Sequence, residues 1–469
     1  MKRREFFKNA AITGLGASLL SPEKLFANNN LYKPDDWKGK TAKNIIFLVS
    51  DGMSSGTLNM ADLLMQQKFG KHSNWVQLYK ENKIYRSLMD TASASSLVTD
   101  SAAASSSWGS GFRVKNGSLN VGVNGEKYKP ILQKFKNAGK AVGCVTTVPI
   151  THATPAGFCV NNDSRNSQPE IALQYLPLKF DVMMGAGTEY FDASLREDKR
   201  DVFSEYTKNG YSVVKSRNEM YSAEKAKPIL GVFSKKSLPY AIDREHDAEL
   251  KEKTPSLAEM TQVAIDRLST NSNGFVLQVE AGKVDWAAHA NDTTAIIYDQ
   301  IAFDEAIAVA VKFAEKNTDT LVIITTDHGN SNPALLYGDD TNDKFDKIQK
   351  HQFSNDWVLQ GIKSNDSVDT IIERLAFAQG ITITKEEASS LLDSYKNLND
   401  VGNYSPYKLP FEKLASIQKN YTNVGWAGNN HTGDFVELAM YGAGSDQLLP
   451  FIKNTDLHYF MLAATGVKG

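Results

Sequence analysis

Ser101 is the most informative residue of this chain, because the sequence offers types of residue that could ligate metal ions, and not a base, to activate its hydroxyl. A serine hydroxyl is a poor nucleophile near neutral pH and must be activated by a base or by a metal ion. The segment Val-Thr-Asp-Ser-Ala-Ala-Ala around Ser101 contains no Gly-x-Ser-x-Gly turn. The chain offers instead a set of carboxylates and imidazoles, namely Asp51, Glu280, Asp285, His289, Asp327, His328 and His431. A serine with enough ligands for two metal ions indicates phosphoryl transfer.

Several of these ligands directly follow predicted strands. Residues 44–49, 275–279 and 321–325 are nearly continuous in apolar or β-branched residues, as is typical of strands covered on both faces. Asp51 comes just after the first run, Glu280 after the second, and Asp327 and His328 after the third. Taken alone, an aspartate that follows a strand most often caps the next helix. Sites in open α/β sheets form outside the carboxyl ends of the strands, so the combination predicts a shared site.

Asp285 and His289 are four residues apart, so one helical turn would present both to a single metal ion. A hydrogen-bonded pair on a helix surface would have the same spacing. His431 follows Gly-Asn-Asn and precedes Thr-Gly, which is typical of a ligand on a loop.

The elements that must position these residues indicate an α/β fold. Further strands are predicted at residues 141–146 and 435–441, and helices at 131–138, 257–268 and 301–315. Strands alternating with helices predict a three-layer α/β/α sandwich with a central, mostly parallel sheet. From residue 330 to about 422 the pattern loosens around two helix-like stretches, 367–378 and 385–398. We interpret residues 40–469 as one catalytic domain with a crown-like subdomain inserted at about 330–422.

Charge and hydropathy limit the partners. The 469-residue chain has a net charge of −2, so no basic surface indicates nucleic acid or an anionic membrane as a partner. No stretch of the mature chain is long and apolar enough for a typical membrane span. Arg3 and Arg4 precede two phenylalanines, a lysine and a weakly apolar run at 10–20. This arrangement resembles a twin-arginine export signal, so residues 1–27 are predicted to direct export to the periplasm or the medium.

The two cysteines, Cys144 and Cys159, do not have the spacing of a Cys-x-x-Cys motif. Two buried free thiols are the simpler interpretation. A disulfide is also compatible with an exported protein, and the sequence does not decide between the two.

Six motifs of this chain resemble those of the alkaline phosphatases and occur in that family's order. They are Val-Ser-Asp-Gly-Met at 49–53, Thr-Asp-Ser-Ala-Ala at 99–103, His-Ala-Thr-Pro-Ala at 152–156, Glu-Ala-Gly-Lys-Val-Asp at 280–285 with a histidine at 289, Thr-Asp-His-Gly at 326–329, and His-Thr-Gly at 431–433. The match runs from residue 44 to about 442 and is weakest across the predicted insertion. The resemblance implies hydrolysis of small phosphate monoesters through a phosphoserine intermediate on Ser101.

The resemblance also implies two zinc ions and a third metal ion, Mg²⁺. The ligands matched to the first zinc are Asp285, His289 and His431. Those matched to the second are Asp51, Asp327 and His328, together with Ser101. Those matched to the third metal are Asp51, Thr154 and Glu280. Histidine combined with carboxylate suits zinc, and a set of oxygen atoms suits magnesium.

Arg165 matches the family's phosphate-binding arginine, whose guanidinium can hold two phosphate oxygens at once. Without the surrounding motifs it would be taken for a solvated arginine on a loop. Asp100 is expected to orient nearby donors, Arg165 among them. Ser101 is expected to open a helix, whose N-terminal amide dipoles favour anionic states of the serine.

Two positions depart from the best-known bacterial members, which carry aspartate where His152 stands and lysine where Trp286 stands. A histidine at the third site makes Zn²⁺ or Co²⁺ an alternative to Mg²⁺ there. Trp286 is predicted to line the substrate site. Because it replaces a cation next to the phosphate, the phosphate product is expected to leave more readily. The resemblance leaves open whether the chain forms the homodimer that is common in the family.

Other functions fit parts of this pattern. A phosphodiesterase of the same metal superfamily would use similar ligands. A sulfatase needs a Cys- or Ser-x-Pro-x-Arg segment, and none surrounds Ser101. An exported phosphate- or metal-binding protein without catalysis would have no need of a nucleophile beside two metal sites. The sequence therefore favours a phosphomonoesterase.

Overall fold

The structure of the protein is a computed structural model that describes residues 31–396 and 408–468. The predicted signal peptide at residues 1–27 lies outside the described residues. Across the two described ranges, none of the helices is long and apolar enough to cross a membrane.

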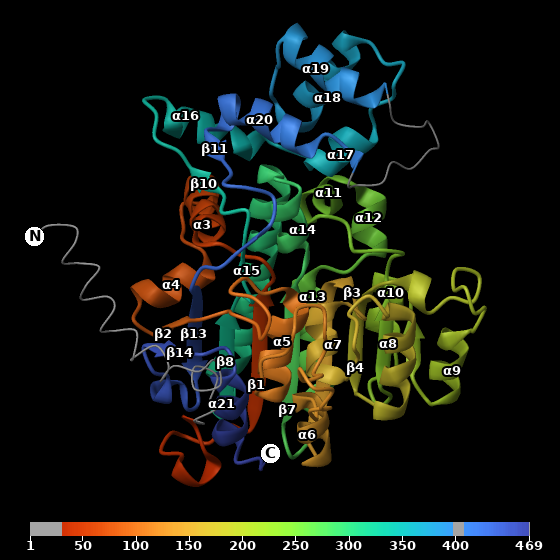
Figure 1. The fold of residues 1–469 in the computed structure, drawn as a ribbon, viewed down its shortest axis with the longest axis vertical. Coiled ribbons are helices and arrows are strands. Elements are labelled where there is room, and N and C mark those ends of the chain that lie inside the picture. The colour runs from red at the N-terminus through yellow and green to blue at the C-terminus, as the bar shows by residue number, and fades with distance from the viewer. Residues whose placement is uncertain (1–30, 397–407, 469) are drawn as a thin grey trace, which may run out of the picture.

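A ten-stranded sheet forms the centre of the molecule, in the order β14-β2-β13-β8-β1-β7-β3-β4-β6-β5 (Figure 1). The strands in chain order are β1 (Asn44–Ser50), β2 (Tyr85–Met89), β3 (Ala141–Pro149), β4 (Val182–Ala186), β5 (Ser212–Val214), β6 (Ile229–Val232), β7 (Phe275–Ala281), β8 (Thr320–Thr325), β13 (Val436–Gly442) and β14 (Phe451–Ile452). β13 runs antiparallel to its neighbours β8 and β2, and the other pairings are parallel. The predicted mostly parallel sheet is confirmed.

Helices cover both faces of the sheet. One hydrophobic cluster joins the sheet to α5 (Ser101–Ser110), α6 (Ile131–Asn137), α7 (Ala153–Cys159), α8 (Gln168–Tyr175), α9 (Val202–Lys208) and α21 (Asp456–Thr465). A second joins the opposite face to α3 (Ser55–Phe69), α4 (Asn74–Lys80), α10 (Arg217–Ser222), α11 (Ala241–His246), α13 (Leu257–Leu268), α14 (Lys283–His289) and α15 (Thr293–Lys316). The short α12 (Ala248–Lys253) follows α11 and buries none of its residues. The three-layer α/β/α architecture is therefore confirmed.

The central strands are buried along their whole length. Every residue of β1, β3, β7 and β8 is buried, which explains why their sequences are nearly continuous in apolar and β-branched residues. β1 lies between β7 and β8, with Val49 beside both Glu280 and Thr325. This register brings the carboxyl ends of the three strands to one edge of the sheet.

The chain from Gly329 onward leaves this sheet and returns to it at β13. It forms β9 (Gly329–Asn330), β10 (Ala334–Leu335), α16 (Thr341–Asp346), α17 (Asn355–Gln360), α18 (Val368–Gln379), α19 (Lys385–Tyr395), α20 (Phe411–Thr422), β11 (Val424–Gly425) and β12 (His431–Thr432). Helices α17 to α20 surround a hydrophobic cluster of their own, and Figure 1 shows them beyond one end of the sheet. The buried Asp292 carboxylate accepts hydrogen bonds from the backbone amides of Ala295 (2.9 Å) and Asn355 (2.7 Å), so it joins the start of α15 to the start of α17.

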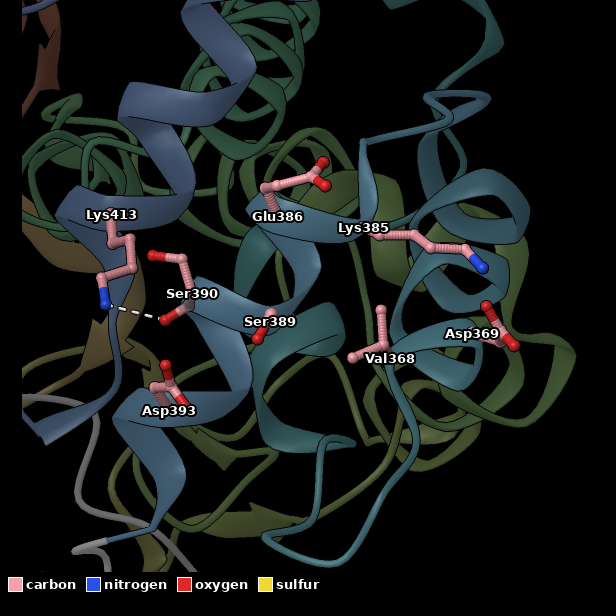
Figure 2. A pocket seen from close by; sticks show the side chains of 8 residues that line it. All are labelled: Val368, Asp369, Lys385, Glu386, Ser389, Ser390, Asp393 and Lys413. Atoms are coloured by element: carbon pink, nitrogen blue, oxygen red, sulfur yellow. Dashed lines mark hydrogen bonds between the residues drawn. The ribbon is translucent and has the colours of Figure 1, made fainter.

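A surface pocket of about 580 Å³ lies between α18, α19 and α20 (Figure 2). Its lining mixes charges of both signs, and Lys413 Nζ donates a hydrogen bond to the Ser390 carbonyl at 2.8 Å. None of the eight lining residues belongs to the predicted ligand set. This pocket therefore does not contain the candidate ligands at the carboxyl ends of the strands.

Candidate active site

Three carboxylates are buried at the carboxyl ends of the central strands. Asp51 and Glu280 have no exposed surface, and Asp327 is 1% exposed. Asp51 follows β1 directly, and Asp327 comes two residues after β8. Glu280 lies within β7 and pairs with Thr146 of β3. Strand β7 therefore extends two residues beyond its predicted end at residue 279. Three acidic groups out of water at one place stay ionised only with positive charge nearby.

The structure gathers the predicted ligands into three groups, in each of which the candidate ligand atoms lie within 4.8 Å of one another. These groups are Asp285, His289 and His431; Asp51, Asp327 and His328; and Asp51, His152 and Glu280. Thr154 also reaches the third group, because its Oγ1 lies 3.5 Å from Asp51 Oδ2. Segments of the chain more than 300 residues apart thus converge on one site.

In the first group, two imidazoles turn the same nitrogen toward Asp285. The Nε2 atoms of His289 and His431 lie 3.1 Å apart and are 3.5 Å and 3.6 Å from the Asp285 carboxylate. Each Nδ1 contacts a backbone carbonyl at 2.9 Å, that of Asn429 for His289 and that of Thr99 for His431. A carbonyl can only accept, so each Nδ1 carries the proton and each Nε2 keeps its lone pair. Two facing lone pairs beside a carboxylate suit a metal ion.

Sequence reasoning missed Asn330, which holds Asp285 in place. The buried Asn330 Nδ2 donates a hydrogen bond to Asp285 Oδ1 at 2.7 Å, and Asn330 Oδ1 accepts one from Ser331 Oγ at 2.7 Å. The backbone of Asn330 pairs with that of His431 across β9 and β12. Burial would raise the pKa of Asp285, but the neighbouring imidazoles and Asn330 lower it to about 2. The position two residues after His328 was the available clue to this role.

The second group surrounds Ser101. Ser101 Oγ lies 3.3 Å from His328 Nε2, which is 3.2 Å from Asp327 Oδ2 and 3.7 Å from Asp51 Oδ1. Neither of these two carboxylate oxygens has a hydrogen-bond partner among the described residues, although both are buried. Burial, followed by the charges of Asp327, Asp285 and Glu280, raises the pKa of Asp51 well above its usual range. A bound cation would satisfy both oxygens and favour their ionised forms, so the donor set fits a metal ion.

The third group contains Glu280, Thr154 and His152. Glu280 Oε1 has no hydrogen-bond partner among the described residues, and burial raises the pKa of Glu280 to about 7. His152 Nε2 lies 3.0 Å from a guanidinium nitrogen of Arg165 and must accept from it, because guanidinium only donates. Burial, with the Arg165 charge second, lowers the pKa of His152 to about 3. This neutral tautomer carries its proton on Nδ1, which lies 4.0 Å from Glu280 Oε1.

Ser101 is the first residue of α5, and Asp100 caps that helix. Asp100 Oδ1 accepts a hydrogen bond from the Ala103 amide at 2.9 Å, while Oδ2 accepts one from Arg165 at 3.0 Å. The guanidinium of Arg165 is therefore held on one side by Asp100 and on the other by His152. The ring of Trp286 stands edge-on to the His152 ring, with centroids 6.2 Å apart. Asp100, Arg165, His152 and Trp286 thus form a chain of contacts that begins at the residue before Ser101.

Comparisons with known proteins agree on one family. The family model described as alkaline phosphatase matches residues 42–467. Alkaline phosphatase 4 of Bacillus subtilis is 30% identical over an alignment of 471 positions that covers 97% of each chain. The Escherichia coli alkaline phosphatase is 27% identical over 92% of this chain and 88% of its own. The crystal structure of Thermus thermophilus alkaline phosphatase superposes with a TM-score of 0.86 at 30% identity, covering 94% of each chain.

With zinc as the probe, we expect Asn330→Ala to weaken metal binding at the first group by about 10- to 100-fold, the usual effect of removing a partner that orients a metal ligand. The loss follows because Asp285 would be free to turn away from the two imidazoles. Chelator competition measures the affinity, and the rise of the unfolding midpoint on adding zinc gives a second readout.

Asn429→Ala is the matched control, because the contact of Asn429 with His289 is through the backbone carbonyl and survives the substitution. The control should bind zinc as the parent protein does. Equal zinc affinity of the Asn330→Ala variant and the parent would contradict the role given to Asn330.

Proposed function

The chain belongs to the alkaline phosphatase family and hydrolyses phosphate monoesters, and on this premise we propose that Ser101 is its nucleophile. The observation that carries the proposal is the place of Ser101 Oγ, which is 3.3 Å from His328 Nε2 beside the unpartnered oxygens of Asp51 and Asp327. The hydroxyl attacks phosphorus, and the alcohol leaves with a proton. Water then hydrolyses the phosphoserine and releases inorganic phosphate.

We propose that two zinc ions and one magnesium ion complete the site. Asp285, His289 and His431 would hold the first zinc, while Asp51, Asp327 and His328 would hold the second. Asp51, Glu280 and Thr154 offer oxygen atoms only, which favours Mg²⁺ over Zn²⁺ or Co²⁺ for the third ion. When bound, these ions supply positive charge that favours the Ser101 alkoxide and offsets the charge of the phosphate oxygens.

The remaining groups bind and orient the phosphate. Arg165 presents two parallel donors to two phosphate oxygens, a geometry that suits guanidinium better than an ammonium group. Asp100 and His152 fix the plane of that guanidinium, each through a contact of 3.0 Å. The first turn of α5 places backbone amides around Ser101, and their dipoles favour its anionic states. His152 then acts as a positioning residue for Arg165, and Trp286 lines the site beside it.

We propose that residues 330–422 are an inserted subdomain of the catalytic domain. The separate hydrophobic cluster of α17 to α20 supports this division. The link through Asp292 supports a fixed attachment, because one buried carboxylate holds the starts of both α15 and α17.

Replacing the nucleophile separates catalysis from binding. We expect Ser101→Ala to lower hydrolysis of a nitrophenyl phosphate monoester by about a thousandfold or more, on the scale seen when other hydrolases lose their nucleophile. Inorganic phosphate should still bind, because Arg165 and the metal ligands remain. Steady-state rates and phosphate binding are measured on the zinc-loaded protein.

Ser107→Ala, in the same helix and equally buried, is the matched control and should keep most of the activity. A burst of phosphoenzyme that persists in the Ser101→Ala variant would contradict the assignment of Ser101 as the nucleophile. The matching nitrophenyl diester is expected to react more slowly than the monoester, and the opposite order would assign a phosphodiesterase.

The pair His152 and Trp286 is expected to tune product release. In a variant with both His152→Asp and Trp286→Lys, we expect the inhibition constant of inorganic phosphate to fall on the order of tenfold. The reason is that one hydrogen bond to a charged group stabilises a complex by about 1.5 kcal/mol. Inhibition of monoester hydrolysis by inorganic phosphate is measured, with each single substitution as a control. An unchanged inhibition constant would argue against this tuning.

We propose that residues 1–27 direct export through a twin-arginine pathway to the periplasm or the medium. Replacing Arg3 and Arg4 with lysine should leave the protein inside the cell, because the twin arginines are what distinguishes this type of signal. Activity in the exported and cell fractions measures the outcome. Export at the parental level would show that the arginine pair is not read as a signal.

A further inference from the structure

The only two cysteines of the chain meet in its core. Cys144 lies in the middle of β3, and Cys159 is the last residue of α7. Their sulfur atoms are 3.8 Å apart as thiols, and neither residue has any exposed surface. A disulfide needs about 2.05 Å between the sulfurs, so the pair lies within reach of a small movement.

The segment between the two cysteines carries several groups of the active site. Thr146 of β3 donates a hydrogen bond to Glu280, and both His152 and Thr154 lie at the start of α7. On its other side, α7 packs tightly against the helix of Ser101. A Cβ atom added at Gly157 would come within 2.2 Å of Ser105 Oγ. A bond from Cys144 to Cys159 would therefore fasten α7 to the sheet while α5 confines it from the other side.

We propose that Cys144 and Cys159 are a redox pair whose state is fixed as the chain folds. Folding in oxidising surroundings joins them in a disulfide, and folding in reducing surroundings leaves a protected dithiol. In the oxidation, two S–H bonds break and one S–S bond forms. The two electrons and two protons pass to a disulfide oxidant, which becomes two thiols.

Burial is the reason that the state is fixed during folding. Thiol–disulfide exchange requires a thiolate and direct access of the oxidant to a sulfur atom. Neither sulfur is reachable once α7 lies on β3, and burial raises the pKa of the Cys159 thiol well above its usual range. Exchange must precede the docking of α7. The pair thereby records the compartment in which the chain folded, which would be a reducing one if the protein is exported already folded.

The experiment refolds the reduced, denatured full chain in two buffers, one with oxidised and reduced glutathione and one with an excess of reductant. After folding, free thiols are alkylated under denaturing conditions and the intact mass is measured. We expect no alkylation and a mass lower by two hydrogens after oxidising refolding, and two alkylated cysteines after reducing refolding. The oxidised form should unfold at a higher temperature, because the bond restricts the unfolded chain.

A second measurement tests the protection of the folded dithiol. The folded, reduced protein is placed in the oxidising buffer and sampled over hours, with the denatured chain as the reference. The folded protein should keep both thiols while the denatured chain loses them. Oxidation of the folded protein as fast as that of the denatured chain would overturn the proposal. Two free thiols, or one bound glutathione, after oxidising refolding would overturn it as well.

Cys144→Ala provides the matched control. Its unfolding temperature should be the same after oxidising and reducing refolding, because Cys159 then has no partner within the chain. A shift between the buffers equal to that of the parent protein would show that the stabilisation has another origin. If this variant does not fold, the alkylation pattern of the parent protein still decides the question.

Discussion

Buried negative charge at the carboxyl ends of the central strands is the constraint on which the rest of the structure depends. Asp51, Glu280 and Asp327 are all removed from water, and oxygens of each lack a partner among the described residues. No lysine or arginine side chain forms an ion pair with these three carboxylates in the described part of the chain. Burial raises the pKa of Asp51 and Glu280, so these carboxyl groups stay ionised only if positive charge compensates them.

The fold meets this constraint through register and through distant backbone partners. Parallel pairing of β1 with β7 and β8 fixes the spacing of the strand ends that carry the acids. The imidazoles of His289 and His431 are then oriented by carbonyls of other segments, and that of His431 comes from Thr99, two residues before Ser101. The orientation of the His431 imidazole and the position of Ser101 are in this way linked through one short stretch of backbone.

The segment from Cys144 in β3 to Cys159 at the end of α7 shows how closely packing and chemistry are joined. It contains the groups that face Glu280 and Arg165, and a cysteine stands at each of its ends. The close approach of Gly157 to Ser105 leaves no room for a side chain between α7 and α5. A change in how α7 is held would therefore affect both Arg165 and α5, the helix that Ser101 opens.

The sequence by itself determined the family, the α/β class and the central strands, because apolar runs and short motifs are local properties. Ser101, Asp51 and Asp327 could be proposed as site residues for the same reason, since each stands at a fixed place beside a strand or helix. The sequence missed the shorter strands β2, β4, β5, β6 and β14 of the central sheet, Asn330, and the tautomer of His152. It also left the meeting of Cys144 and Cys159 undecided. Only the tertiary structure decided these, because each depends on which residue a distant segment places next to it.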